Sequence, residues 1–224
     1  MDASNAVADS RRIGGRWEPL TGIAFVVLFV AAVFILPTPN DDDPDKTWVA
    51  FYADHTHRVL SVVAAFMFVF AGLSLLAFLT CVWRRIRARR PDASPLPLLT
   101  ATMAAMGIAL GGLVGATITG AMIFGSLKEP GADALKVVEE MAFPILLIGG
   151  IYPAALSVAV LGFQARAAGL FPKWLLILSY VAAVLLLASV AFFPMIFLVI
   201  WVIVVAVLLL RSGPAPAARS ATST

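Results

Sequence analysis

The chain has 224 residues, of which 61% are hydrophobic and only 13% are charged, with a formal net charge of +3. A soluble domain is roughly 45–50% apolar and about 25% charged, so this composition disfavours a soluble domain and favours an integral membrane protein. The basic residues lie between apolar runs, which is typical of a membrane topology signal and not of a nucleic-acid partner. Cys81 is the one cysteine, which excludes an internal disulfide.

Six apolar runs follow one another along the chain, and a membrane-spanning helix needs about 20 such residues. The first, residues 20–36, ends at Pro37 beside a poor cleavage site, so we expect an uncleaved span. The last two are separated only by Phe193-Pro194, where we expect a tight turn; one span plus a re-entrant segment is the alternative. After the first span, the five further predicted spans cover residues 59–83, 98–124, 141–163, 174–192 and 195–210.

The charged residues predict the orientation of these spans. With six spans, one side holds both termini and the arginine-rich segment 84–90, and the other side holds most of the acidic residues. Positive charge favours the cytoplasm, so both termini are predicted to be cytoplasmic. A five-span arrangement fits the charges nearly as well. The expected organisation is a polar N-terminus (1–19), an all-α bundle of six transmembrane helices (20–210) and a disordered cytoplasmic tail (211–224).

The first predicted outer loop contains the segment DDDPDKTWVAFYADHTHR, residues 41–58. Asp43 before Pro44 predicts a helix start, with a side-chain acceptor at the N-cap and proline at the first helical position. We therefore expect a short interfacial helix on the membrane surface or on the bundle, and an ion pair between Asp54 and Arg58. The apolar face of that helix is predicted to contain Trp48, Phe51, Tyr52 and His55.

The same loop raises the question of a metal site. The three aspartates at 41, 43 and 45 resemble the start of a calcium loop, but Lys46 and Tyr52 occupy positions that need glycine and glutamate. A looser site is a weak candidate, and a solvated acidic surface is the preferred interpretation. A proton sensor at His55 or His57 is a further alternative. No cofactor is predicted; the weak metal candidates are Asp54, His57, Glu139 and Glu140.

No charged residue falls inside the six spans as drawn. Proton pathways, Schiff-base lysines and histidine-bound haem need such residues at membrane depth, so the sequence argues against these classes. The third predicted span contains small residues at helical spacing. Gly107, Gly111 and Gly115 form one face with the spacing that lets helices approach closely, and they predict either internal packing or an oligomer interface.

The fourth predicted span contains Pro144, Pro153 and the pair Gly149-Gly150. A helix broken at mid-membrane is typical of a transporter site, and an ordinary proline kink is the alternative. The residues predicted to line such an intramembrane pocket are Thr117, Thr119, Gly149, Gly150, Tyr152, Pro153 and Ser157.

The layout also resembles a family. A first span ending in ILPTPN, FYADHTHR entering the second, an arginine-rich inner loop and GLFPKWL entering the fifth are similar to small uncharacterised actinobacterial membrane proteins. The resemblance implies a bacterial inner membrane and carries over no site residue.

Three functions are compatible with these patterns. The first is a non-enzymatic membrane component that self-associates or joins a larger complex. The second is a transporter or channel for a neutral or apolar small molecule that uses the broken fourth span. The third is a metal or pH sensor on the outer face. The sequence names no substrate, no partner other than the lipid bilayer, and no catalytic residue.

Overall fold

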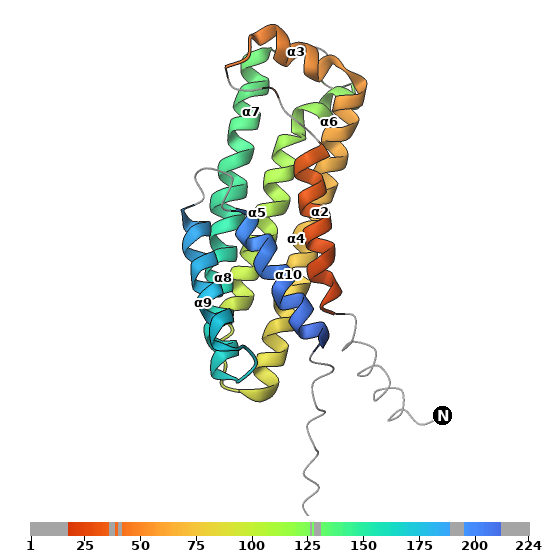
Figure 1. The fold of residues 1–224 in the computed structure, drawn as a ribbon. Coiled ribbons are helices and arrows are strands. Elements are labelled where there is room, and N and C mark those ends of the chain that lie inside the picture. Colours follow the sequence, from red (N-terminus) through yellow and green to blue (C-terminus); the bar gives the residue numbers. More distant parts are fainter. Residues whose placement is uncertain are drawn as a thin grey trace, which may run out of the picture.

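Three long helical columns form the frame of the protein (Figure 1). The computed structural model describes residues 18–35, 39, 42–125, 127, 131–188 and 195–211. One column is α4 (His55–Arg89), and the second is α5 (Leu96–Gly115) continued by α6 (Thr117–Ile123). The third is unbroken from Ala132 to Ala167 and consists of α7 (Ala132–Pro144), the π-helix η1 (Ile145–Ile151) and α8 (Tyr152–Ala167).

Three shorter helices pack beside this frame. They are α2 (Leu20–Ile35), α9 (Lys173–Leu187) and α10 (Ile196–Arg211). At 1.5 Å per residue the 35 residues of α4 extend about 52 Å, whereas the shorter helices extend about 22–24 Å. In Figure 1, α9 and α10 therefore accompany only one half of the frame.

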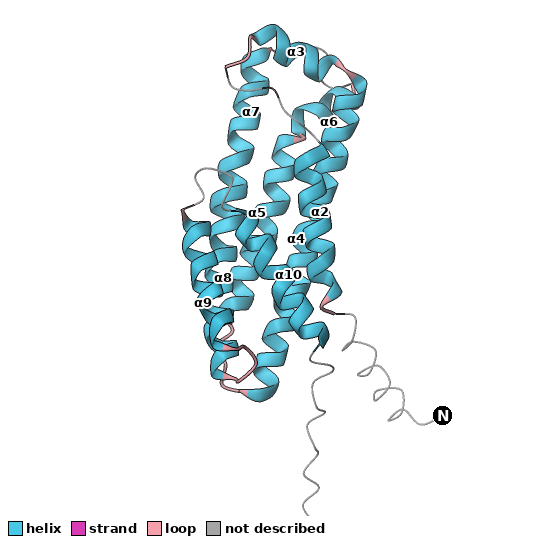
Figure 2. Cartoon of the chain, viewed as in Figure 1, coloured by secondary structure: helices cyan, strands magenta, loops and turns pink. Residues whose placement is uncertain are grey.

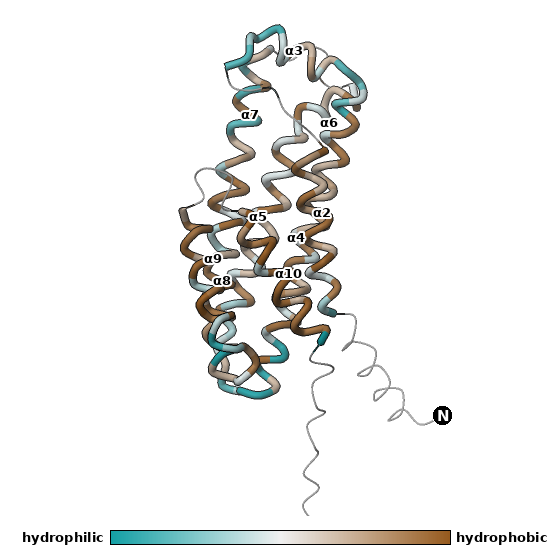
Figure 3. Tube along the Cα trace, in the orientation of Figure 1, coloured by the Kyte–Doolittle hydropathy of each residue, from teal (hydrophilic) through white to brown (hydrophobic). Residues whose placement is uncertain are grey.

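The two ends of the bundle differ in charge. We call the end with the last turns of α4 and the α4–α5 connection the basic end, because Arg84, Arg85, Arg87, Arg89 and Arg90 lie there. At the opposite, acidic end the short helix α3 (Asp45–Ala53) lies across the bundle above α7 and α4. Hydrophilic residues gather at these two ends and hydrophobic residues lie between them (Figure 3).

Helices account for every element that the described ranges contain, and the connections within those ranges are short turns (Figure 2), so the all-α prediction is confirmed for that part of the chain. Three of the described helices are long and apolar enough to cross a membrane: His55–Arg89, Leu96–Gly115 and Ala132–Ala167. The three shorter helices are also apolar. The predicted turn at Phe193-Pro194, most of the polar N-terminus and the tail after Arg211 lie outside the described residues.

Several predicted boundaries were wrong for identifiable reasons. The helix that contains the fourth run begins at Ala132, before the predicted span at residue 141, because the charged segment before Met141 continues the same helix. The third run bends at Ala116, whose φ of −94° and ψ of 2° end α5. The short helix begins at Asp45 after Pro44, which makes no side-chain cap. It ends before Asp54, because Asp54 accepts a hydrogen bond from the Thr56 amide (2.8 Å) and caps α4.

That cap also changes the predicted partners in this loop. His55 begins α4 and is exposed, so it does not share the buried face of α3. The predicted Asp54–Arg58 ion pair is not formed between these two described residues. Instead the Asp54 carboxylate lies 3.6 Å from His57 Nδ1.

The core of the basic half is closed by α9 and α10. Trp201 of α10 is fully buried, and its indole Nε1 donates to Ser179 Oγ of α9 (2.9 Å). Phe78 of α4 packs edge-on against the Trp201 ring at 6.4 Å. Gly162 of α8 lies so close to Ser179 that an added Cβ would come within 2.5 Å of it. At the basic end Arg85 Nη1 donates to the Leu209 carbonyl of α10 (3.3 Å), which the helix itself leaves unpaired.

Candidate binding cavity at the acidic end

A cavity of about 260 Å³ lies between α2, α4, α5 and α7 in the acidic half of the bundle. Its lining is mostly small or apolar, and among the described lining residues only Ser61 and Glu139 carry polar side chains. Apolar pockets with a few convergent polar groups are the usual form of small-molecule sites. The lining residues are Ala32, Val33, Ser61, Ala64, Ala65, Phe68, Gly111, Gly112, Gly115, Ala116, Glu139, Ala142, Phe143 and Leu146.

Small residues on α5 create this space. An added Cβ on Gly112 would come within 2.6 Å of Phe68, and one on Gly111 within 2.8 Å of Leu146. At Gly115 the nearest atom to an added Cβ would be Ala142 Cβ, at an ordinary 3.5 Å. The walls are therefore tight at Gly111 and Gly112, whereas Gly115 borders the open volume.

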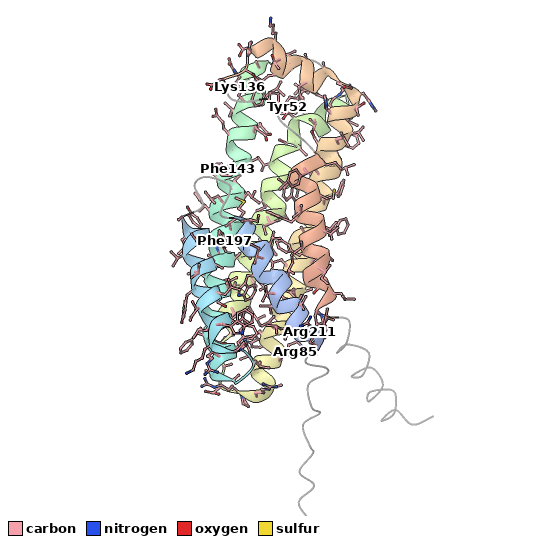
Figure 4. All side chains as sticks on the ribbon, in the orientation of Figure 1. Tyr52, Arg85, Lys136, Phe143, Phe197 and Arg211 are labelled. Carbon is pink, nitrogen blue, oxygen red and sulfur yellow. The ribbon has the colours of Figure 1, made fainter. Side chains whose placement is uncertain are left out.

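Glu139 is the one charged side chain among the described lining residues, and it is half-buried. Its carboxylate oxygen Oε2 accepts a hydrogen bond from the hydroxyl of Tyr52 in α3 (3.4 Å). Burial raises the pKa of Tyr52, and the neighbouring Glu139 carboxylate raises it further. Tyr52 therefore keeps its proton and remains a donor to Glu139. Figure 4 labels Tyr52 of α3 at the acidic end and Phe143 further down, on α7.

The helix α3 is attached to the frame at both of its ends. Trp48 and Tyr52 pack with Leu135 of α7 in a small buried cluster, and Lys136 Nζ donates to Asp45 Oδ1 (2.7 Å). At the other end the His57 ring of α4 stacks on Phe51 at 4.1 Å. His57 Nδ1 also lies 3.1 Å from the Phe51 carbonyl oxygen. These contacts place α3 as a cover over the acidic end.

The weak metal candidates are not brought together. Asp54 and His57 lie beside each other at the start of α4, whereas Glu139 faces the cavity and Glu140 is exposed. Within the described ranges no group of three or more His, Cys, Asp or Glu side chains could hold a metal ion. Asp54 and His57, whose side chains lie 3.6 Å apart, form an ion pair when His57 is protonated.

The glycine face of α5 packs inside the chain. An added Cβ on Gly107 would overlap the backbone of Gly149 and Gly150 in η1, and Gly111 faces Leu146 of the same segment. Such close approach is the general use of small residues between membrane helices. The face that suggested an oligomer interface is thus occupied by η1 at Gly107 and Gly111.

The seven residues predicted to line an intramembrane pocket do not form one site. Ser157 is fully buried near the basic end, where its hydroxyl lies 2.6 Å from Thr100 Oγ1. Thr119 is buried and bonds to the Ala116 carbonyl (2.9 Å), while Thr117 is exposed and bonds to Val114. Thr100 and Thr119 are separated by about 28 Å along the column at 1.5 Å per residue. Gly149 and Gly150 contact α5; Tyr152 is half-buried and Pro153 is buried.

The predicted break in the fourth run is a π-helical segment within a continuous column. Pro144 has helical angles (φ −58°, ψ −37°), and the π-helix begins at the next residue. Proline removes a backbone donor, and the wider π turn accommodates that loss without ending the helix. Leu146 of this segment lines the cavity, so the irregular backbone adjoins the candidate site.

The sequence prediction missed the cavity because its walls come from four helices. One signal was present: Leu135, Glu139, Ala142 and Leu146 have the spacing of one helix face, and Ser61, Ala65 and Phe68 repeat that spacing on α4. The predicted start of the fourth span at residue 141 placed Glu139 in a loop and hid the first stripe.

Comparisons with protein-family models, curated proteins and solved structures find no match to this chain. The cavity and its lining residues therefore carry the functional argument.

Proposed function

We propose that the protein is a non-enzymatic, multi-pass membrane protein that binds a small, largely apolar molecule in the cavity beneath α3. The observation that carries this proposal is the cavity itself, about 260 Å³ lined by small and apolar residues with one carboxylate. Among the described lining residues Ser61 carries the one hydroxyl, and it donates to the His57 carbonyl (3.0 Å), an arrangement that favours a structural role over nucleophilic attack.

The proposal includes six spans with both termini in the cytoplasm of a bacterial plasma membrane. The lengths of α2, α9 and α10, about 22–24 Å, are within the mismatch that a bilayer core of roughly 30 Å accommodates. Large apolar side chains are exposed around the middle of the bundle, as lipid contact requires; among them are Val27, Phe66, Phe70, Ile148, Leu156 and Val184. The arginines of the basic end favour the cytoplasmic side.

This placement locates the cavity near the outer membrane surface. Ser61 and Arg84 of α4 are separated by about 35 Å at 1.5 Å per residue, which is close to the thickness of the hydrocarbon core. A molecule could then enter from the outer leaflet or from the space beneath α3.

Binding of a neutral probe to the protein in lipid nanodiscs tests the proposal. We expect saturable binding of para-fluoro-neopentylbenzene by fluorine NMR, with empty nanodiscs as the blank. Gly115→Leu places a side chain in the cavity and should weaken binding about tenfold or more, or roughly 1.4 kcal/mol. Gly120→Leu is the matched control, because nothing lies within 4 Å of a Cβ added there. Equal binding by both variants and the wild type would contradict the proposal.

A second candidate function, transfer of the bound molecule across the membrane, is favoured by η1. π-helical segments occur frequently at functional sites, and this one forms part of the cavity wall. Pro144→Ala restores the missing backbone donor and should slow release of the probe from proteoliposomes while leaving its binding intact. Release rates equal to those of protein-free liposomes for the wild type would rule out transfer.

A further inference from the structure

We infer that the basic end binds an anionic phospholipid, whose phosphate lies against Arg89, Arg166 and Lys173 and whose acyl chains lie on the exposed apolar side chains of α8 and α9. This inference goes beyond binding in the cavity and concerns the opposite end of the bundle. It requires only the proposed placement of the apolar helices in a membrane.

The connection between α8 and α9, residues 168–172, brings cations from three helices together. Arg89, the last residue of α4, donates from Nη1 to the Gly169 carbonyl (3.3 Å). Arg166 of α8 donates from Nη1 to the Phe171 carbonyl (3.4 Å). Lys173, the exposed first residue of α9, directly follows the connection. Two guanidinium groups and one ammonium group therefore gather around one short connection, although α4 is distant from it in the sequence.

The α8–α9 connection has a defined conformation. Helix α8 ends at Gly169, which lies in the left-handed region (φ 68°), and the Leu170 amide donates to the Ala165 carbonyl (2.8 Å). Helix ends closed in this way satisfy carbonyls that would otherwise lack partners. Phe171 is buried and belongs to the main hydrophobic core. The carbonyls that the two arginines contact are therefore held in place, so the guanidinium groups are positioned before a ligand binds.

The cations at this connection are not neutralised within the described part of the chain. Glu18 and Asp92 are the acidic residues described at the basic end, and they form ion pairs with Arg84 and Arg90 (2.8 Å each). The two arginines at the connection contact neutral carbonyls instead. A guanidinium group has five N–H donors, so one bond to a carbonyl leaves donors for phosphate oxygens, which arginine binds well.

Exposed apolar side chains lie beside these cations, toward the middle of the bundle. Phe163 precedes Arg166 by about one turn of α8 and is 58% exposed. Trp174 directly follows Lys173 and is 51% exposed, and Ile177 is exposed in the next turn of α9. Figure 3 shows the same change, from hydrophilic residues at this end to hydrophobic residues along α8 and α9. Exposed tryptophan is typical of the membrane–water interface.

This arrangement matches a phospholipid better than a free phosphate compound, because charged and apolar contacts lie one above the other. Clusters of lysine and arginine at the cytoplasmic ends of membrane helices are a recurrent environment for anionic headgroups. The headgroup phosphate would receive the guanidinium and ammonium donors. The acyl chains would cover the apolar side chains below them.

The test compares two phospholipids that have the same acyl chains and differ in headgroup charge. The full chain, purified in a neutral detergent, is mixed with equal amounts of dioleoylphosphatidylglycerol, which is anionic, and dioleoylphosphatidylcholine, which is zwitterionic. Native mass spectrometry then counts the bound lipids. We expect phosphatidylglycerol to be retained in about tenfold or greater excess, as several cations near one headgroup allow. Equal retention of the two lipids, or of neither, would overturn the inference.

A competitor distinguishes a lipid from a free phosphate compound. Excess glycerol phosphate carries the phosphate group without acyl chains, so it should not displace bound phosphatidylglycerol. Displacement would show that the site recognises the phosphate group alone and would overturn the assignment to a lipid.

Two double variants assign the preference to the α8–α9 connection. Arg89→Gln with Arg166→Gln removes both guanidinium charges, keeps amide donors for the carbonyls, and should lower the preference about tenfold or more. Arg84→Gln with Arg90→Gln removes the same charge from the same end, at residues that are paired with carboxylates, and should keep the preference. An equal fall in both would assign the preference to the general positive field and overturn the site.

A single variant serves where the first double variant fails to fold. Lys173→Gln changes an exposed side chain and should lower the preference about fivefold. An unchanged preference would contradict the place of Lys173 at the headgroup. The result is also separable from the proposed function. Lipid preference without binding of para-fluoro-neopentylbenzene contradicts only the cavity, whereas binding of that probe without lipid preference contradicts only this inference.

Discussion

The basic and acidic halves of the bundle are built from the same long columns but differ in what fills the space between them. In the basic half α9 and α10 bring in Trp201, which packs against Phe78 and Ser179. In the acidic half those two helices are absent from the bundle (Figure 1), and glycine and alanine border a cavity beneath α3. The tightly packed region and the cavity therefore lie in different halves of the same long columns. They differ because α9 and α10 are too short to reach the acidic half.

The largest effect is expected in the basic half. Trp201→Ala removes a fully buried ring and leaves the Ser179 hydroxyl without its donor, which should cost about 3–5 kcal/mol of unfolding free energy. Trp174→Ala is the control, because that ring is half exposed and should change stability by less than about 1 kcal/mol. Denaturation in detergent, followed by circular dichroism, measures both. Similar losses would show that the buried contacts of Trp201 stabilise the basic half no more than the exposed ring of Trp174 does.

The glycines of α5 test the boundary between the halves. Gly107→Ala forces α5 away from Gly149 and should cost about 1–3 kcal/mol. Gly115→Ala adds the same methyl group beside the cavity and should be within about 0.5 kcal/mol of the wild type. Equal destabilisation of the two variants by the same denaturation measurement would mean that the cavity does not extend to Gly115.

A smaller effect on stability, which depends on pH, is expected at Tyr52 of α3, the helix that covers the acidic end. The pKa of Tyr52 is raised in the folded state, so its contribution to stability is present below the unfolded value of 10.0 and is lost as pH rises above it. Tyr52→Phe should cost about 1 kcal/mol at neutral pH through the lost hydrogen bond and should reduce the alkaline loss of stability. Tyr180→Phe, at an exposed position, should keep the alkaline loss unchanged. If Tyr52→Phe lost as much stability at alkaline pH as the wild type, ionisation of Tyr52 would not be the cause of that loss.

The smallest effect concerns the junction of α3 and α4. Asp54→Ala removes the cap on Thr56 and the neighbour of His57, which should cost about 1 kcal/mol. Hydrogen exchange should then speed up in the first turn of α4, whereas Asp42→Ala, just before α3, should leave that turn unchanged. Faster hydrogen exchange in α3 alone would instead show that Asp54 stabilises α3 and not the first turn of α4.

The sequence predicted the helical class and the positions of the six apolar runs, because apolar content and helix length follow directly from residue order. The sequence could not predict the contacts of Trp201, since Ser179 and Phe78 belong to other helices. The glycine face was predicted with two alternatives, and the contact of Gly107 with Gly149 distinguishes them at that position. The cavity was missed because Glu139 and Glu140 were placed in a loop before the predicted fourth span, whereas the helix begins at Ala132 and includes them.

The order in which the chain is synthesised gives the last hairpin a particular importance. Helix α10 emerges from the ribosome after every other described helix, yet it supplies Trp201 and receives the Arg85 contact at Leu209. A nascent chain that stops before Ile196 would leave Phe78 without its Trp201 contact and Ser179 without its indole donor. The packed core of the basic half therefore forms only after α10, the last described helix, has been synthesised.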